Sequence, residues 1–108
     1  MNLTHMHCNA THARKILDAQ EIDDLRLTLP EWDIAGKKLI KTFEFIDYYE
    51  TIAFVNALAW ICHKEDHHPD LFVQYNRVRI EWSTHDTGTL TLNDFICAAK
   101  CEALRPKN

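Results

Sequence analysis

The order in which two hydrophobic periods alternate along the chain constrains its fold most strongly. Apolar residues recur at helical spacing in three segments, residues 18–29, 47–62 and 91–104. Between them lie two segments, residues 32–45 and 71–82, which are rich in β-branched and aromatic residues and predict β-hairpins. The predicted order is αββαββα. Its simplest packing is an α+β fold, a single four-stranded antiparallel sheet with three helices on one face.

Each predicted helix begins with the residues of a capping box, in which a cap residue is followed three positions later by an acidic side chain. The three pairs are Asp18 with Glu21, Asp47 with Glu50, and Thr91 with Asp94. Prolines mark the other ends of these segments. Pro30 follows the first helix, Pro69 limits the second from beyond its end, and Pro106 stops the third.

Turn residues divide each strand-like segment in two. They are Gly36 in the first segment, and Asn76 with Arg77 in the second. Alternation along residues 38–45 places Leu39, Phe43 and Phe45 on one face of a strand, which we expect to face the core.

Composition indicates one globular domain without a nucleic-acid partner. The chain has 108 residues and 46% apolar content, enough to bury a core without covalent or metal staples. Residues 1–12 show no hydrophobic period, so we expect a flexible N-terminal arm ahead of a domain at residues 13–108. The formal net charge is -4, whereas phosphate binding needs clustered Lys and Arg.

No membrane or secretory segment is expected. The longest nearly apolar stretch, residues 52–62, is far shorter than the roughly 20 residues that span a bilayer. The first fifteen residues contain neither a sustained apolar region nor a small-residue cleavage site. We therefore expect a cytoplasmic protein with no membrane partner.

The four cysteines are expected to be free thiols, because a domain that builds its own core needs no disulfide framework. Cys97 and Cys101 share a helix face at i,i+4. No second ligand pair lies near them in sequence, so this spacing favours packing over a zinc site.

The candidate chemistry is concentrated where the second helix ends. His63, His67 and His68 lie within six residues, just before Pro69. His85 follows the last predicted strand, and an antiparallel hairpin returns that strand's end toward the place where its first strand began. Imidazole exchanges protons near neutral pH, because its ordinary pKa is about 6.5. The sequence therefore predicts proton transfer by converging histidines, with no motif for a covalent nucleophile.

The same residues also fit a purely structural role or a metal site. His63 and His67 could simply be cations favoured at a helix C-terminus. The four histidines, with Asp66 nearby, also offer ligands for a metal, although the spacing lacks the glutamate of a metalloprotease helix. For Asp94, the capping role at the third helix is sufficient by itself to account for an acidic residue.

The spacing of these residues resembles one known family, the pterin-4a-carbinolamine dehydratases, also called dimerisation cofactors of a homeodomain transcription factor. The family motif is matched by His67, His68, Pro69, Tyr75, His85 and Asp94. The likeness extends from Leu17 to Leu104 and includes Trp32, the Phe-Glu-Phe sequence at residues 43–45, and Ser83-Thr84-His85.

The resemblance implies an enzyme, a hydro-lyase that dehydrates 4a-hydroxytetrahydrobiopterin to quinonoid dihydropterin during pterin cofactor recycling for aromatic amino acid hydroxylation. It assigns acid–base catalysis to His67, His68 and His85. It also assigns substrate binding and support to a second set of residues, in which Asp66 would orient the histidines. That set is Asp66, Pro69, Thr84, Asp86, Thr87 and Asp94. The family implies no metal or organic cofactor, and a homodimer or homotetramer.

Two residues depart from the family pattern. Leu71 lies where many relatives have Trp, and His63 lies where an acidic residue is frequent. Neither change removes a proton carrier, but Leu71 could loosen one wall of the pocket. An alternative function within the family is a non-catalytic protein-binding module that acts as a transcriptional partner.

Overall fold

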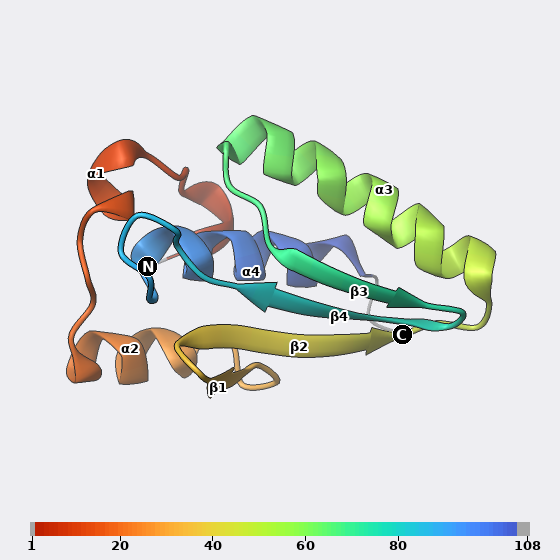
Figure 1. The fold of residues 1–108 in the computed structure, drawn as a ribbon, viewed down its shortest axis with the longest axis horizontal. Helices are drawn as coiled ribbons and strands as arrows, with labels where there is room; N and C mark the ends of the chain where they lie inside the picture. The colour runs from red at the N-terminus through yellow and green to blue at the C-terminus, as the bar shows by residue number, and fades with distance from the viewer. Residues whose placement is uncertain (1, 106–108) are drawn as a thin grey trace.

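The computed structural model describes residues 2–105, which form the predicted α+β fold (Figure 1). The elements in chain order are η1 (Leu3–His5), α1 (Ala10–Ala13), α2 (Ala19–Arg26), β1 (Asp33–Ala35), β2 (Lys38–Glu44), α3 (Tyr48–Glu65), β3 (Asp70–Gln74), β4 (Arg77–Trp82) and α4 (Leu92–Leu104). The predicted αββαββα order is confirmed from α2 onward. The structure adds two short helical turns before it: η1 lies within the segment expected to be an arm, residues 1–12, and α1 extends one residue beyond that segment. Pro106 lies outside the described residues.

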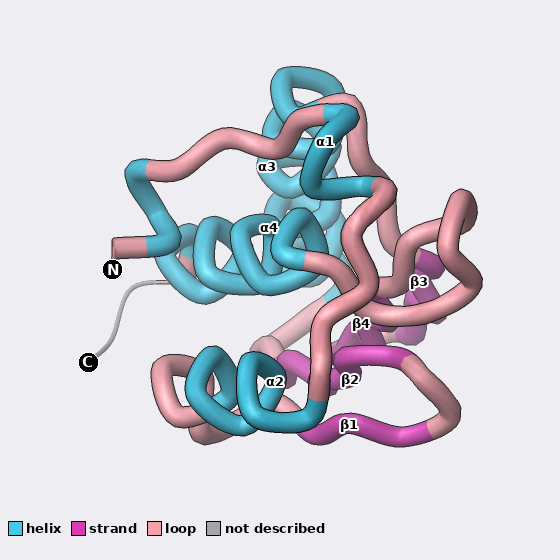
Figure 2. The backbone as a smooth tube through the Cα atoms, turned by 90° about the vertical axis from the view of Figure 1, so that its left-hand side faces the viewer, coloured by secondary structure: helices cyan, strands magenta, loops and turns pink. Residues whose placement is uncertain are grey.

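The four strands form one antiparallel sheet in the order β1-β2-β4-β3. The helices lie on one side of it, as the view in Figure 2 shows. Between the layers are large side chains with less than 2% of their surface exposed, which are Trp32, Trp82, Phe43, Phe95, Leu39, Leu58, Ile80 and Ile96. Burial of each such side chain contributes about 1.5–3 kcal/mol, so this layer supplies most of the driving force for folding.

The turn of the first hairpin lies at Gly36, as the sequence predicted. Gly36 has φ 56° and Lys37 has φ 62°, so both residues adopt the left-handed conformation that two-residue hairpin turns require. Leu39 and Phe43 of β2 face the core, as the alternation predicted, and Phe45 is partly buried just beyond the strand.

Two local predictions were wrong in detail. The second turn comprises Tyr75 and Asn76, while Arg77 begins β4 and pairs with Gln74. Asp47 accepts a hydrogen bond from the Glu50 N–H at 2.9 Å, but the Glu50 carboxylate accepts from the Ile46 N–H at 3.3 Å. In a full capping box the Glu50 carboxylate would accept from the N–H of the cap residue Asp47. Here it accepts from the N–H one residue earlier, because the chain enters α3 with the Ile46 amide facing the helix.

The N-terminal segment packs against the domain. Leu3 is buried in the core, and the Cys8 N–H donates to Glu65 Oε1 at 2.7 Å. Asn9 and Asn93 exchange two hydrogen bonds: the Asn9 N–H donates to Asn93 Oδ1 at 3.2 Å, and Asn93 Nδ2 donates to the Asn9 carbonyl at 3.0 Å. The mobility of this segment stays a prediction, but its backbone has defined partners on α3 and α4.

All four cysteines are free, and Cys97 and Cys101 are buried. Burial raises the pKa of the Cys62 thiol to about 11 and raises the pKa of Cys101 beyond the ordinary range. These thiols are protonated at neutral pH and act as small apolar side chains. Within residues 2–105, no helix has both the length and the apolar character to cross a membrane.

Glu65 is a buried carboxylate that ties the N-terminal segment to two helices. It accepts hydrogen bonds from the Cys8 N–H, from Lys100 Nζ at 2.9 Å and from His7 Nδ1 at 3.0 Å. Burial alone would raise the pKa of Glu65, but these three donors outweigh it and lower the pKa from 4.5 to about 2.

We predict that Glu65 makes the free energy of unfolding depend on pH in acid. Because the folded-state pKa is lowered, the stabilisation is complete above about pH 4.5 and is lost as the pH falls toward 2. It is on the order of 3 kcal/mol. In urea unfolding between pH 2.5 and 7, Glu65→Gln should be less stable at neutral pH and should flatten this acid dependence. Glu44→Gln, on the exposed sheet face, is the control, and equal pH dependence in both variants would contradict the prediction.

Candidate active site

A pocket of about 450 Å³ brings together the histidines that the sequence singled out. It lies where the C-terminal end of α3, the loop after β4, α1 and the start of α4 meet, at one end of the molecule (Figure 1). Six of the predicted site residues line it: Asp66, His67, His68, Thr84, His85 and Asp86.

The end of α3 explains how adjacent histidines reach this pocket. Asp66 adopts a left-handed conformation, with φ 50° and ψ 44°, directly after Glu65. The His67 N–H donates to the Cys62 carbonyl at 3.2 Å and closes the helix end. The chain therefore leaves the helix one residue before His67. Asp tolerates this backbone conformation better than most residues with a side chain.

Asp94 holds His67 in place. His67 Nε2 lies 2.7 Å from Asp94 Oδ1. The other carboxylate oxygen, Oδ2, accepts from the Thr84 hydroxyl at 2.8 Å and from the Thr91 N–H at 2.9 Å. The Asp94 side chain is completely buried. Its charge is therefore satisfied by these three donors, which come from three separate segments of the chain.

This contact determines what His67 can do chemically. Because a carboxylate only accepts hydrogen bonds, Nε2 carries a proton and Nδ1 is the accepting nitrogen of the neutral ring. The His67 ring stacks on Trp82, with centroids 5.5 Å apart and planes inclined by 13°, which limits its rotation further.

His68 and His85 form the second part of the imidazole cluster. Their ring centroids are 5.8 Å apart, and both side chains lie at the pocket wall. The prediction that the β3–β4 hairpin returns His85 to the end of α3 is confirmed by this contact. All three rings line the pocket and can contact a bound molecule directly, and the His67 ring is in addition held between Asp94 and Trp82.

Of the residues predicted to bind the substrate or support the histidines, some line the pocket and others do not. The carboxylate that orients a histidine is that of Asp94, whereas Asp66, expected in this role, is exposed at the pocket wall. Asp66 is the left-handed C-cap residue of α3 and lines the same pocket as the histidines. Among the described residues, Pro69 and Thr87 lie outside the set that lines the pocket. The Thr87 hydroxyl bonds to the carbonyls of Thr84 and Thr89 and shapes the loop.

Sequence reasoning missed part of the pocket wall. Four of the pocket-lining residues that the sequence did not predict come from the N-terminal segment: Cys8, Asn9, Ala10 and Ala13. Lys64, Glu65 and Asn93 also line the pocket and were not expected there. No local signal identifies them, because the segment has no hydrophobic period and its contacts join residues more than 50 positions apart.

His63 does not belong to the cluster. Its ring packs edge-on against Trp60, with centroids 6.3 Å apart, and it is absent from the pocket lining. Among residues 2–105, no group of three His, Cys, Asp or Glu side chains has an arrangement that could hold a metal ion.

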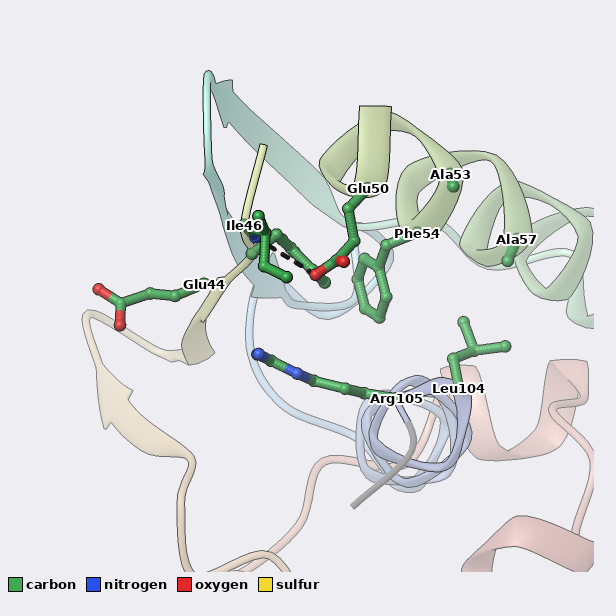
Figure 3. Close-up of a pocket in the computed structure, with 9 residues that line it drawn as sticks. Glu44, Ile46, Glu50, Ala53, Phe54, Ala57, Leu104 and Arg105 are labelled. Atoms are coloured by element: carbon green, nitrogen blue, oxygen red, sulfur yellow. Dashed lines mark hydrogen bonds between the residues drawn. The ribbon is translucent and has the colours of Figure 1, made fainter. Parts of the chain in front are cut away.

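A larger groove, of about 660 Å³, lies at the other end of α3 (Figure 3). Its lining includes Phe54, Ala57 and Leu104, and its Glu50 carboxylate is engaged by the Ile46 N–H. Figure 3 shows the Glu44 carboxylate pointing away from the other lining side chains. Because no histidine is among the described residues that line this groove, we assign the candidate chemistry to the smaller pocket.

Comparison with known proteins agrees with the family likeness of the sequence. Residues 15–104 match the family described as pterin 4 alpha carbinolamine dehydratase. A relative from Chromobacterium violaceum, whose name assigns it to the pterin-4-alpha-carbinolamine dehydratases, is 56% identical over 96% of both chains. A relative from Xanthomonas euvesicatoria with the same assignment is 56% identical over 82% of this chain and 76% of its own.

Two solved structures share the fold. A transcriptional coactivator/pterin dehydratase from Brucella melitensis superposes with a TM-score of 0.80 at 28% identity, over 83% of this chain and 98% of that one. A pterin dehydratase-like protein, identified as a RuBisCO assembly factor in the alpha-carboxysome, has a TM-score of 0.56 at 27% identity, over 68% of this chain and 84% of that one. The family match, the high identity to its members and the shared fold show that this chain belongs to the pterin 4 alpha carbinolamine dehydratase family.

Proposed function

We propose that this protein dehydrates 4a-hydroxytetrahydropterin to quinonoid dihydropterin by histidine acid–base catalysis. The observation that supports it best is the pocket in which a carboxylate-bound His67 lies with the His68–His85 pair. Family membership supplies the pterin substrate.

The reaction needs one proton acceptor and one proton donor. The C4a–O bond breaks, and the hydroxyl accepts a proton and leaves as water. N5 loses its proton, and the electrons of that N–H bond form the C4a=N5 double bond. No electrons are gained or lost overall, so the reaction as written requires no redox cofactor, and we include none in the proposal.

The pocket offers different histidines for these two steps. We assign proton removal from N5 to His67, because the buried Asp94 carboxylate stabilises the ring once Nδ1 has accepted a proton. We assign proton donation to the leaving hydroxyl to the second pair, His68 and His85. Thr84 is a positioning residue, because its hydroxyl is bound to Asp94. Asp66 and Asp86 stay proposed contacts of the substrate at the pocket wall.

A non-catalytic binding role is the alternative. One structural neighbour is named for RuBisCO assembly and another as a transcriptional coactivator, so the fold alone does not determine catalysis. The intact arrangement of His67 with Asp94 favours the enzyme for this chain, because a binding surface does not require an oriented imidazole.

The proposal includes self-association and a cytoplasmic location. β3 is an edge strand of the sheet, and its Phe72 and Val73 side chains are 53% and 41% exposed. An exposed apolar edge is a template for pairing with another strand, so we place a homo-oligomer contact there. Free thiols are typical of the reducing cytoplasm.

We predict that the purified protein accelerates loss of enzymatically generated 4a-hydroxytetrahydropterin, and that His67→Ala and His85→Ala each lower kcat/KM by about 100-fold or more. His63→Ala is the matched control and should retain activity, because His63 packs on Trp60 outside the pocket. The assay is a stopped-flow absorbance measurement, run with and without a chelator. Full activity in the His67/His85 double variant would overturn the assignment, and loss of wild-type activity with the chelator would favour the metal alternative.

For Asp94→Asn we expect kcat/KM to fall by about 10- to 100-fold, the worth of one hydrogen bond to a charged group. The loss should fall on kcat rather than on KM, because Asp94 is not among the residues that line the pocket and acts through the orientation of His67. Thr84→Val removes a donor to the opposite carboxylate oxygen and keeps the contact with His67, so it should lower stability with a smaller loss of kcat. An unchanged kcat in Asp94→Asn would show that Asp94 acts only as a helix cap.

The self-association proposal is tested by sedimentation velocity. Phe72→Lys should shift the protein to a smaller species, because it places a charge on the edge strand. Leu27→Lys alters an equally apolar, 81% exposed position after α2 and should leave the assembly unchanged. A monomeric wild type, or equal effects of both substitutions, would contradict pairing at β3.

A further inference from the structure

We propose that the N-terminal segment, residues 7–13, is a substrate-specificity wall of the catalytic pocket and contacts the substituent at C6 of the pterin. The family match begins only at residue 15, yet Cys8, Asn9, Ala10 and Ala13 line the same pocket as the histidines. The inference rests on the proposed function and concerns which pterin the site prefers.

This wall is attached to the elements that position the catalytic groups. Asn93, which exchanges two hydrogen bonds with Asn9, is 3% exposed and directly precedes Asp94. Glu65, which accepts from the Cys8 N–H, is 6% exposed and lies two residues before His67. Because a buried polar group left without its partner costs about 1–3 kcal/mol, these contacts hold the segment at the pocket.

The chemistry of the wall indicates which part of the substrate it meets. The reacting atoms C4a and N5 must face the histidines, and C6 is bonded to N5, so the C6 substituent lies beside the catalytic groups. The pyrimidine end of a pterin needs hydrogen-bonding partners for its fixed donors and acceptors, and the methyl groups of Ala10 and Ala13 supply none. Small side chains instead leave room for a substituent of variable size.

The proposed specificity belongs to the N-terminal segment rather than to the part of the chain that matches the family, residues 15–104. The match with the Brucella melitensis structure covers 98% of that chain but only 83% of this one. A pocket formed by residues 15–104 alone would lack the wall that α1 supplies. Substrate preference can therefore differ among members that share the same histidines.

The test compares two substrates that differ only at C6, the 4a-hydroxy forms of tetrahydrobiopterin and of 6-methyltetrahydropterin. In Ala13→Leu and in Ala10→Leu, we expect KM for the biopterin substrate to rise by about 10-fold, since a few added methylene groups change affinity by that order. KM for the 6-methyl substrate should change by less than about 3-fold, and kcat for either should be nearly constant. Thr11→Leu is the matched control, because Thr11 is an exposed residue of the same helical turn and does not line the pocket.

The outcomes separate this inference from the proposed function. Suppose that wild type is active and that His67→Ala abolishes this activity, but that the leucine variants change KM equally for both substrates or for neither. The proposed role of the wall is then overturned, and the catalytic proposal stands. If wild type turns over neither substrate, the catalytic proposal fails. Equilibrium binding of biopterin and 6-methylpterin, followed by their fluorescence, then tests the wall alone. Selective weakening of biopterin binding in Ala13→Leu supports it, and no binding or equal weakening overturns it. Thermal unfolding of each variant verifies that the fold is intact.

Discussion

The buried carboxylate of Asp94 is the interaction on which the candidate site depends. It accepts hydrogen bonds from the His67 ring, the Thr84 hydroxyl and the Thr91 amide, and it has no exposed surface. A buried charge is tolerated only when hydrogen bonds satisfy it, so these donors must arrive together. One side chain therefore joins the start of α4, the end of β4 and the chain after α3, and it orients the imidazole that we assign to proton removal.

A second buried carboxylate, Glu65, connects the other side of the pocket. Its partners are the Cys8 amide, Lys100 and His7, so it joins the N-terminal segment to α3 and α4. Glu65 itself lines the pocket, and Asp94 directly follows the pocket-lining Asn93. The pocket is thus bounded by segments whose positions depend on satisfied charges, and rearrangement of either segment would leave a charge unpaired.

The comparisons separate the scaffold from its use. Proteins named for pterin dehydration, for transcriptional coactivation and for RuBisCO assembly share this arrangement of one sheet and its helices. Such a fold provides a place where the end of a helix and the end of a strand meet, and chemistry depends on which side chains lie there. In this chain they are three histidines, one of them held by a carboxylate.

Local patterns in the sequence determined the element order, the first hairpin turn, the cap residues of the helices and the approach of His85 to His68, because periodicity, turn chemistry and antiparallel return depend on neighbouring residues. The spacing of the histidines also indicated the family. Tertiary structure alone decided that Asp94 rather than Asp66 orients His67, and that the N-terminal segment completes the pocket wall. Those contacts join residues 27, 57 and 84 positions apart. No local period encodes such pairs, because they form only when packing of the helices on the sheet buries the charges and leaves them these partners.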